Sequence, residues 1–271
     1  MTGRSITVTS GKGGVGKTTT TANLGMALAM SGKNVCLIDA DIGLRNLDIV
    51  LGLENRIVYD LVDVVEGNCR LKQALIRDKH YPNLSLIPAA QTRDKEAVSP
   101  EQMADLCRRL TQQFDFVIVD SPAGIEQGFR NAIAGADEVL VVTTPEVSAV
   151  RDADRIIGLV EAAEIPPPRL ILNRLNPALA QRGEMMTMED VTDILAIDLI
   201  GIVPEDSTIV MASNRGEPVV LAEASKAGRA YREIAQRLQG EDVPLVLPTA
   251  HEGTFLDRIL SAFRPRQRVA S

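Results

Sequence analysis

Residues 10–18 read SGKGGVGKT, and this stretch decides which fold the chain can adopt. It follows the apolar run SITVT at 5–9 and opens a helix-like stretch at 17–30. From Gly11 to Thr18 it matches the pattern GxxxxGK[ST], in the strand-to-helix context that this pattern requires. Glycines let backbone N–H groups curl around phosphate oxygens with no Cβ in the way. The stretch therefore predicts a binding site for the phosphates of a nucleotide.

The residue types within this loop each predict a contact. Lys17 is expected to reach the β- and γ-phosphates, and the Thr18 hydroxyl to ligate Mg²⁺. The helix that begins near Lys17 adds the positive end of its dipole. No guanine-reading NKxD motif occurs in the sequence, which favours ATP over GTP. The expected ATP-binding residues of the loop are Gly11, Lys12, Gly13, Gly14, Val15, Gly16, Lys17 and Thr18.

A magnesium–triphosphate site also needs carboxylates, and three follow strand-like runs. Asp120 ends the run at 116–119, while Asp39 and Asp41 follow the run at 34–38. Ligands of open α/β sheets bind at the carboxyl ends of strands. An aspartate in this position can also be a helix cap, so the spacing of Asp39 and Asp41 leaves both roles open.

Short Val/Ile/Leu runs alternate with helix-like segments along the chain. Continuously apolar strands between helices predict an α/β fold, a single doubly wound and mostly parallel sheet with helices on both faces. The expected strands are 5–9, 34–38, 84–87, 116–119, 139–143, 169–172 and 199–203. The expected helices are 17–30, 100–113, 128–134, 149–164, 188–195 and 221–238. We expect a nucleotide-binding domain at 1–239, a linker at 240–253 and a separate tail at 254–271.

Composition excludes several classes of protein. The 271 residues carry a net charge of −7, with a pI near 5.0, which argues against a protein that binds nucleic acid over its whole surface. Two histidines and three distant cysteines give no metal-ligand spacing and no catalytic triad, and they fit a reducing compartment. No apolar run is long enough to span a bilayer. We expect a cytosolic protein, or one attached only to a membrane surface.

The tail has the pattern of a basic amphipathic helix. Its apolar side chains recur at helical spacing, and four arginines against one aspartate give it a net charge of +3 on an acidic body. This pattern favours an anchor on a membrane surface, whereas a helix docked on the core is the alternative. The expected membrane-contacting residues are Phe255, Leu256, Arg258, Ile259, Leu260, Phe263 and Arg264.

Longer motifs carry a resemblance to a known family. KGGVGKT, with its early lysine, resembles the deviant Walker A motif of the ParA/MinD ATPases, and DADIGLRNLDIVLG and DSPAGIE resemble their two switch regions. AQTRDKEAVS, TTPEVSAVRDADR, IVPED and SNRGEPV extend the similarity over most of the chain. The resemblance implies a P-loop ATPase with ATP and Mg²⁺ as cofactors.

The resemblance also assigns roles that spacing alone leaves open. By itself, Lys12 could be a solvated loop lysine; in this family the early lysine reaches the phosphates bound by the other subunit of a dimer. Lys12, Lys17 and Asp41 are then the expected catalytic residues, with Asp41 positioning the attacking water. Thr18, Asp39 and Asp120 are the expected metal-site residues. The expected adenine contacts are Asn173, Arg174, Pro204 and Glu205.

Partners follow from the same resemblance. It implies a homodimer with ATP that sits on the cytoplasmic face of the inner membrane and positions the division septum. A MinC-like division inhibitor and a MinE-like activator are expected to contact Asp152 and Asp154, although these could be ordinary first-turn acids of a helix. A ParA-type ATPase that partitions DNA is the alternative function; the acidic body and the apolar tail disfavour it.

Overall fold

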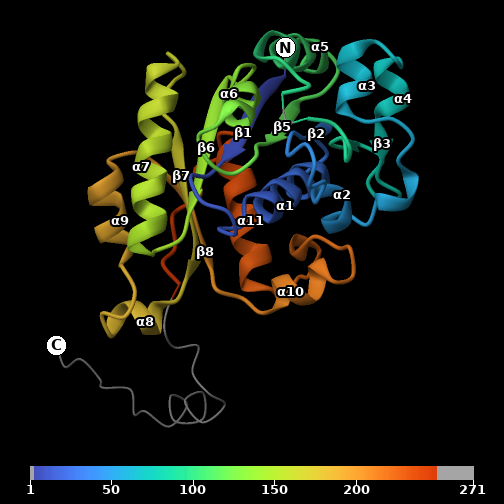
Figure 1. The fold of residues 1–271 in the computed structure, drawn as a ribbon. Helices are drawn as coiled ribbons and strands as arrows, with labels where there is room; N and C mark the ends of the chain where they lie inside the picture. The colour runs from blue at the N-terminus through green and yellow to red at the C-terminus, as the bar shows by residue number, and fades with distance from the viewer. Residues whose placement is uncertain (1–2, 95, 249–271) are drawn as a thin grey trace, which may run out of the picture.

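The computed structural model describes residues 3–94 and 96–248, and its core is one eight-stranded sheet (Figure 1). The strand order is β3-β4-β2-β5-β1-β6-β7-β8, and only the β3–β4 pairing is antiparallel. The strands are β1 (Arg4–Thr9), β2 (Val35–Asp39), β3 (Ile76–Arg77), β4 (Leu84–Ile87), β5 (Phe116–Asp120), β6 (Glu138–Thr143), β7 (Arg169–Leu175) and β8 (Leu199–Pro204). The doubly wound α/β fold is thus confirmed.

Helices cover both faces of the sheet, because successive residues of each buried strand face opposite ways. On β2, Leu37 packs in the cluster under α1 and α11, while Cys36 and Ile38 pack in the cluster under α3, α4 and α5. A third cluster lies under α6, α7 and α9. The helices are α1 (Lys17–Met30), α2 (Leu47–Val50), α3 (Leu61–Glu66), α4 (Leu71–Ala74), α5 (Pro100–Leu110), α6 (Gln127–Ile133), α7 (Val147–Ala162), α8 (Pro177–Gln181), α9 (Met188–Leu195), α10 (Thr208–Ser213) and α11 (Lys226–Leu238).

All seven expected strands form, but the expected helix at 221–238 was wrong at its start. Ser225 accepts a hydrogen bond from the N–H of Gly228 and caps α11, so the helix begins at Lys226. Val219–Leu221 forms a separate 3₁₀ turn, η2. Helix α5 ends at Leu110 instead of continuing to residue 113.

The chain leaves α11 at the amino-terminal edge of the sheet and turns back along it. Arg237 donates hydrogen bonds to the carbonyls of Val243 (2.8 Å), Pro244 (2.7 Å) and Ile200 (3.0 Å). Residues 241–248 form no helix or strand. The expected tail at 254–271, with its membrane-contacting residues, lies outside the described residues, and the division into domain, linker and tail stays a prediction. No helix within residues 3–94 and 96–248 has the length and apolar character to cross a bilayer.

Candidate nucleotide-binding site

The phosphate loop, residues 11–18, joins β1 to α1 at the carboxyl edge of the sheet. Gly14 and Gly16 have φ of 80° and 100°, the left-handed region that side chains rarely adopt. A Cβ on Gly11 would lie 2.2 Å from the backbone oxygen of Asp152 in α7. The glycines therefore serve two needs, because two of them permit the curl of the loop and Gly11 lets the loop rest against α7.

Asn173, at the carboxyl end of β7, forms a hydrogen bond with the middle of the phosphate loop. Its amide nitrogen donates to the carbonyl of Val15 at 2.7 Å, and a Cβ on Gly16 would lie 2.3 Å from the same nitrogen. Its amide oxygen accepts from the N–H of Arg174, a residue with φ of 57°. Asn173 is expected to contact adenine, and the structure shows that its side chain also supports the phosphate loop.

Two buried carboxylates face each other beside the loop. Asp39 and Asp120 are register partners in β2 and β5, and each is 1% exposed. Burial, together with the nearby charge of Asp120, raises the pKa of Asp39 to about 7. Burial raises the pKa of Asp120 to about 6, while Lys17 and the hydroxyls of Thr18 and Thr21 oppose that rise. Such a pair is stabilised by a cation placed between the two groups.

The oxygen donors at this edge fit Mg²⁺. Thr18, Asp39 and Asp120 offer one hydroxyl and two carboxylates, the hard ligands that Mg²⁺ takes together with water and phosphate oxygens. In the described part of the chain, no cluster of three or more His, Cys, Asp or Glu side chains could hold a metal alone. A magnesium ion at this position would complete its coordination with phosphate oxygens and water, and the three metal-site residues stay a prediction.

Asp39 also organises the loop that leads from β2 into α2. Its carboxylate accepts hydrogen bonds from the backbone N–H groups of Asp41 (3.0 Å), Asn46 (3.2 Å) and Leu47 (3.2 Å). We call residues 40–47 the β2 loop. These three bonds join the β2 loop to the end of β2, and the loop carries Asp41 half-buried beside the two buried acids.

Lys12 lies on the outer side of the phosphate loop and turns toward α7. Its ammonium group donates to Ser148 Oγ at 3.0 Å and lies 3.4 Å from a carboxylate oxygen of Glu146. The Lys12 and Glu146 side chains are 42% and 58% exposed, so this ion pair is weak and easily exchanged for another. Within one chain, Lys12 thus contacts the start of α7.

The expected adenine contacts come together at the ends of β7 and β8. Leu175 pairs with Pro204, and the N–H of Glu205 donates to the carbonyl of Leu175 at 3.1 Å. Arg174 is exposed, Pro204 is buried, and Asn176 donates to the Glu205 carboxylate at 2.9 Å. The structure places these residues beside Asn173; the contact with the base stays a prediction.

The two expected partner-binding residues lie in α7. Asp152 is half-buried, its backbone carbonyl packs on Gly11, and its side chain lies 3.9 Å from the guanidinium of Arg155. Asp154 is exposed. The structure therefore places these two residues on the helix that adjoins the phosphate loop, and their contact with a partner stays a prediction.

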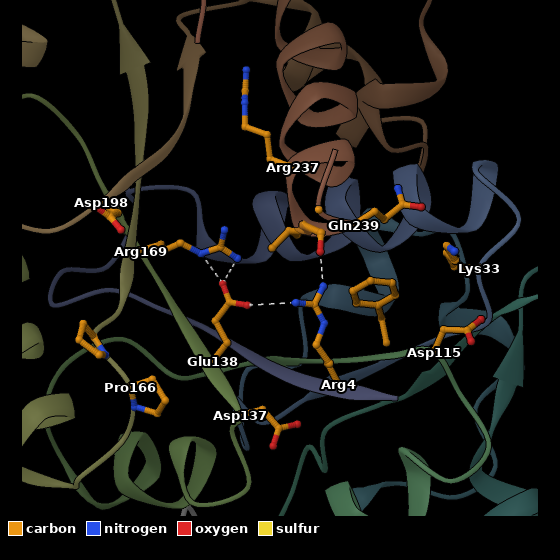
Figure 2. A pocket seen from close by; sticks show the side chains of 14 residues that line it. Arg4, Lys33, Asp115, Asp137, Glu138, Pro166, Arg169, Asp198, Arg237 and Gln239 are labelled. Atoms are coloured by element: carbon orange, nitrogen blue, oxygen red, sulfur yellow. Dashed lines mark hydrogen bonds and ion pairs between the residues drawn. The ribbon is translucent and has the colours of Figure 1, made fainter. Parts of the chain in front are cut away.

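A cavity of about 810 Å³ lies at the opposite edge of the sheet, where the strands begin (Figure 2). Four cations and four carboxylates line it. Arg4 and Arg169 both pair with Glu138, and Arg4 also donates to the carbonyl of Leu238. Its charges cancel, and it shares no residue with the phosphate loop. The remaining charged side chains are Lys33, Asp115, Asp137, Asp198 and Arg237.

Sequence reasoning missed several polar contacts of the site. Glu146 and Ser148 as partners of Lys12, Asn176 as the partner of Glu205, and Thr21 as a donor to Asp120 were not expected. Thr21 is one turn beyond Thr18 in α1, so helical periodicity could have pointed to it. The other contacts join segments far apart in sequence and leave no local pattern.

Comparisons with known proteins agree with this geometry. A family model described as the CobQ/CobB/MinD/ParA nucleotide binding domain matches residues 6–219. The septum site-determining protein MinD of Bacillus subtilis is 56% identical over 266 residues, which cover 97% of this chain and 99% of that protein.

Solved structures with the same fold extend the comparison. The MinC:MinD cell division protein complex of Aquifex aeolicus contains a chain that is 48% identical, with a TM-score of 0.84, covering 90% of this chain and 98% of that one. The septum site-determining protein MinD of Pyrococcus horikoshii, complexed with Mg-ADP, is 30% identical, with a TM-score of 0.79, covering 87% of this chain and 95% of that one.

Proposed function

Because the chain belongs to the CobQ/CobB/MinD/ParA family of nucleotide-binding proteins, we propose that it is a Mg²⁺-dependent ATPase that determines where the division septum forms. The observation that supports this most is the juxtaposition of the phosphate loop with the buried pair Asp39 and Asp120. The extent of identity with septum site-determining proteins favours this function over DNA partitioning.

The chemistry of hydrolysis is divided among residues that three strand ends supply. Backbone N–H groups of the loop and the Lys17 ammonium hold the phosphates. Mg²⁺, when bound, neutralises charge on the β- and γ-phosphates. Asp41 orients the attacking water and accepts its proton, while Asp39 ties the β2 loop to the metal site through its three backbone hydrogen bonds.

The active form is a homodimer assembled around ATP. Lys12 leaves Ser148 and Glu146 and contacts the phosphates bound by the partner chain, in the manner of an arginine finger supplied in trans. The exchange is favourable because a weak, exposed ion pair is replaced by a contact with a polyphosphate. Nucleotide and dimerisation are coupled through this one side chain.

Dimerisation brings two membrane-binding tails together. A basic amphipathic segment of this length is marginally helical in water, and each arginine near an anionic surface contributes roughly 1 kcal/mol. One tail binds weakly and reversibly. Two tails on one dimer gain an avidity of about 10²–10⁴. ATP therefore holds the protein on the cytoplasmic face of the membrane, and hydrolysis releases it to the cytoplasm.

The membrane-bound dimer recruits a MinC-like division inhibitor, and a MinE-like activator stimulates hydrolysis. Asp152 and Asp154 of α7 form part of the surface that these proteins contact. Since the backbone of Asp152 packs directly on Gly11, a partner bound to α7 changes the position of the phosphate loop. The inhibitor thus binds only where the dimer is assembled on the membrane.

Binding of a purified MinC-like protein tests the recruitment step. With ATP, the chain should retain the inhibitor on anionic vesicles, and Asp154→Ala should weaken retention without changing ATP-dependent dimerisation. Glu161→Ala, a change to an exposed acid of the same helix, is the matched control. Equal retention by all three chains would remove Asp154 from the partner surface.

A further inference from the structure

A cavity of about 530 Å³ lies where the sheet meets α4, and its charge is not balanced. Three cations line it, namely Arg56, Lys72 and Arg77. Among the described residues that line it, none is acidic. The chain as a whole has a net charge of −7, and the charges of the cavity in Figure 2 are balanced. The local excess of positive charge in this second cavity therefore favours binding of an anion.

The antiparallel pair β3–β4 places two of the lining residues side by side. Arg77 of β3 is the register partner of Ser85 of β4, so both side chains project from the same face of the sheet. Ser85 in turn pairs with Cys36 of β2, whose side chain belongs to the cluster under α3, α4 and α5. The cavity therefore lies on the α4 face, and it shares no residue with the phosphate loop.

The cations reach the cavity from separate elements. Arg56 ends the 3₁₀ turn η1 (Glu54–Arg56), and its guanidinium donates to the backbone carbonyl of Arg77. Lys72 comes from α4. Within the described residues, neither the Lys72 ammonium nor the Arg77 guanidinium has an ion-pair or hydrogen-bond partner. Both side chains are exposed and line the same cavity, and their donors are available to a ligand.

Ser85 adds a hydroxyl group to the same cavity. Ser85 is 3% exposed and lines the cavity, and across the described part of the chain its hydroxyl has no hydrogen-bond partner. In the described residues the fully buried side-chain oxygens without a hydrogen-bond partner belong to Thr9 and Asp48, so the Ser85 hydroxyl is open to the cavity and free to bind a ligand there. Asp115 accepts hydrogen bonds from Asn34, a residue of the lining, but the Asp115 side chain lines the balanced cavity instead.

We propose that this cavity binds a phosphate monoester, carried either by a soluble metabolite or by a lipid headgroup. A phosphate dianion offers oxygens in several directions, which suits a guanidinium fork, an ammonium group and a hydroxyl arriving from different elements. The volume is in the range of small-molecule sites. This site is independent of the proposed function, since it lies at the opposite edge of the sheet from the nucleotide.

Nuclear magnetic resonance with inorganic phosphate as the probe tests the site. The full chain is saturated with Mg-ADP, so that the phosphate loop is filled, and the backbone amides of Arg77 and Ser85 are followed during the titration. Both signals should shift and saturate. Lys72→Ala/Arg77→Ala should weaken binding by about tenfold or more, because charge-assisted hydrogen bonds are lost. Ser85→Ala should weaken it severalfold.

The matched control is Lys79→Ala/Arg215→Ala, which removes two exposed cations that line none of the cavities described. Its affinity for phosphate should equal that of the unchanged chain. The proposal is overturned if phosphate shifts neither amide, or if the cavity variant and the control bind it equally.

Vesicles containing phosphatidic acid distinguish the two sources of the phosphate. With Mg-ADP present, loss of sedimentation in the cavity variant alone identifies a lipid headgroup. Unchanged sedimentation together with weakened binding of inorganic phosphate identifies a soluble ester. Either result, joined to the phosphate titration, supports the site.

Discussion

The ammonium nitrogen of Lys12 lies 3.4 Å from a carboxylate oxygen of Glu146 and 3.0 Å from Ser148 Oγ. Both charged side chains are substantially exposed, so water competes with the contact and its strength is at most about 1 kcal/mol. Within a single chain, Lys12 therefore contacts the start of α7 only weakly. When a partner chain with bound ATP is present, Lys12 can leave this contact and bind the phosphates of the partner's ATP.

Replacement of Lys12 separates nucleotide binding from pairing of chains. In Lys12→Ala, ATP binding should stay within a few fold of normal, because Lys17 and the loop amides remain, but ATP-dependent dimers should be lost. Light scattering after size exclusion measures the dimer, and a fluorescent ATP analogue measures binding. Lys17→Ala should lose both properties. Dimers of Lys12→Ala with ATP would refute a trans role for this lysine.

Asp41 is expected to act on hydrolysis alone. Asp41→Ala should lower the turnover number by about 10²–10⁴, the usual contribution of a general base, with ATP binding and dimers retained. Phosphate release under saturating ATP gives the rate. Glu161→Ala, on the exposed side of α7, should leave the rate unchanged. Normal turnover in Asp41→Ala would assign the water to another group.

Glycine positions in the phosphate loop differ sharply in what they tolerate. Gly16→Ala combines φ of 100° with a Cβ only 2.3 Å from the Asn173 amide, so it should cost more than about 1 kcal/mol of stability. A loss of that size lowers Tm by roughly 2–4 °C per kcal/mol in a domain of this size. Calorimetry without nucleotide measures it.

Gly13→Ala is the matched control, since its Cβ would meet nothing within 4 Å and its φ is not positive. Its Tm should equal that of the unchanged chain. If both variants lose the same stability, the proximity of the Asn173 amide is not the reason that residue 16 must be glycine.

Asp206 follows β8 and accepts hydrogen bonds from residues at the start of α11. Its contribution to the stability of the fold depends on pH. Partial burial would raise the pKa of Asp206, but hydrogen bonds from Thr208, Ala227 and Ser225 outweigh burial and lower the pKa to about 2. A folded-state pKa below the ordinary value of 3.8 means that the carboxylate stabilises the fold above that pH. This contribution, about 1 kcal/mol after solvent screening, disappears as pH falls from 3.8 toward 2.

Urea unfolding between pH 7 and pH 3 measures this contribution. Asp206→Asn should be less stable than the unchanged chain at pH 7, and the difference should shrink as the pH falls. A difference that does not depend on pH would show that geometry, and not charge, makes Asp206 stabilising.

Much of the fold could be predicted because its strands are buried on both faces. Continuous apolar runs such as 34–38 and 139–143 leave little choice of structure once helix-like segments separate them. The start of α11 could not be predicted in this way. Residues 219–224, VVLAEA, are all compatible with a helix, and the boundary depends on Ser225, whose hydroxyl accepts from the N–H of Gly228 and caps α11.

Strand β3 was not expected because it has only two residues and forms only by pairing with β4. The same limit applies to the site. The loop glycines, Lys17 and Asp120 follow from local motifs, whereas the contact of Asn173 with Val15 joins residues 158 positions apart. Contacts of that kind depend on the tertiary fold, and they are what a sequence alone conceals.

Vesicle co-sedimentation, with the oligomeric state measured in the same samples, tests whether ATP places the protein on a membrane by pairing two chains. The full chain should pellet with vesicles of phosphatidylcholine and phosphatidylglycerol, which carry no phosphate monoester, as a dimer in ATP and remain in solution in ADP. A chain lacking residues 254–271 should hydrolyse ATP at its basal rate but fail to pellet. Equal pelleting in ATP and ADP by a protein that stays monomeric would show that ATP-dependent pairing does not control membrane binding.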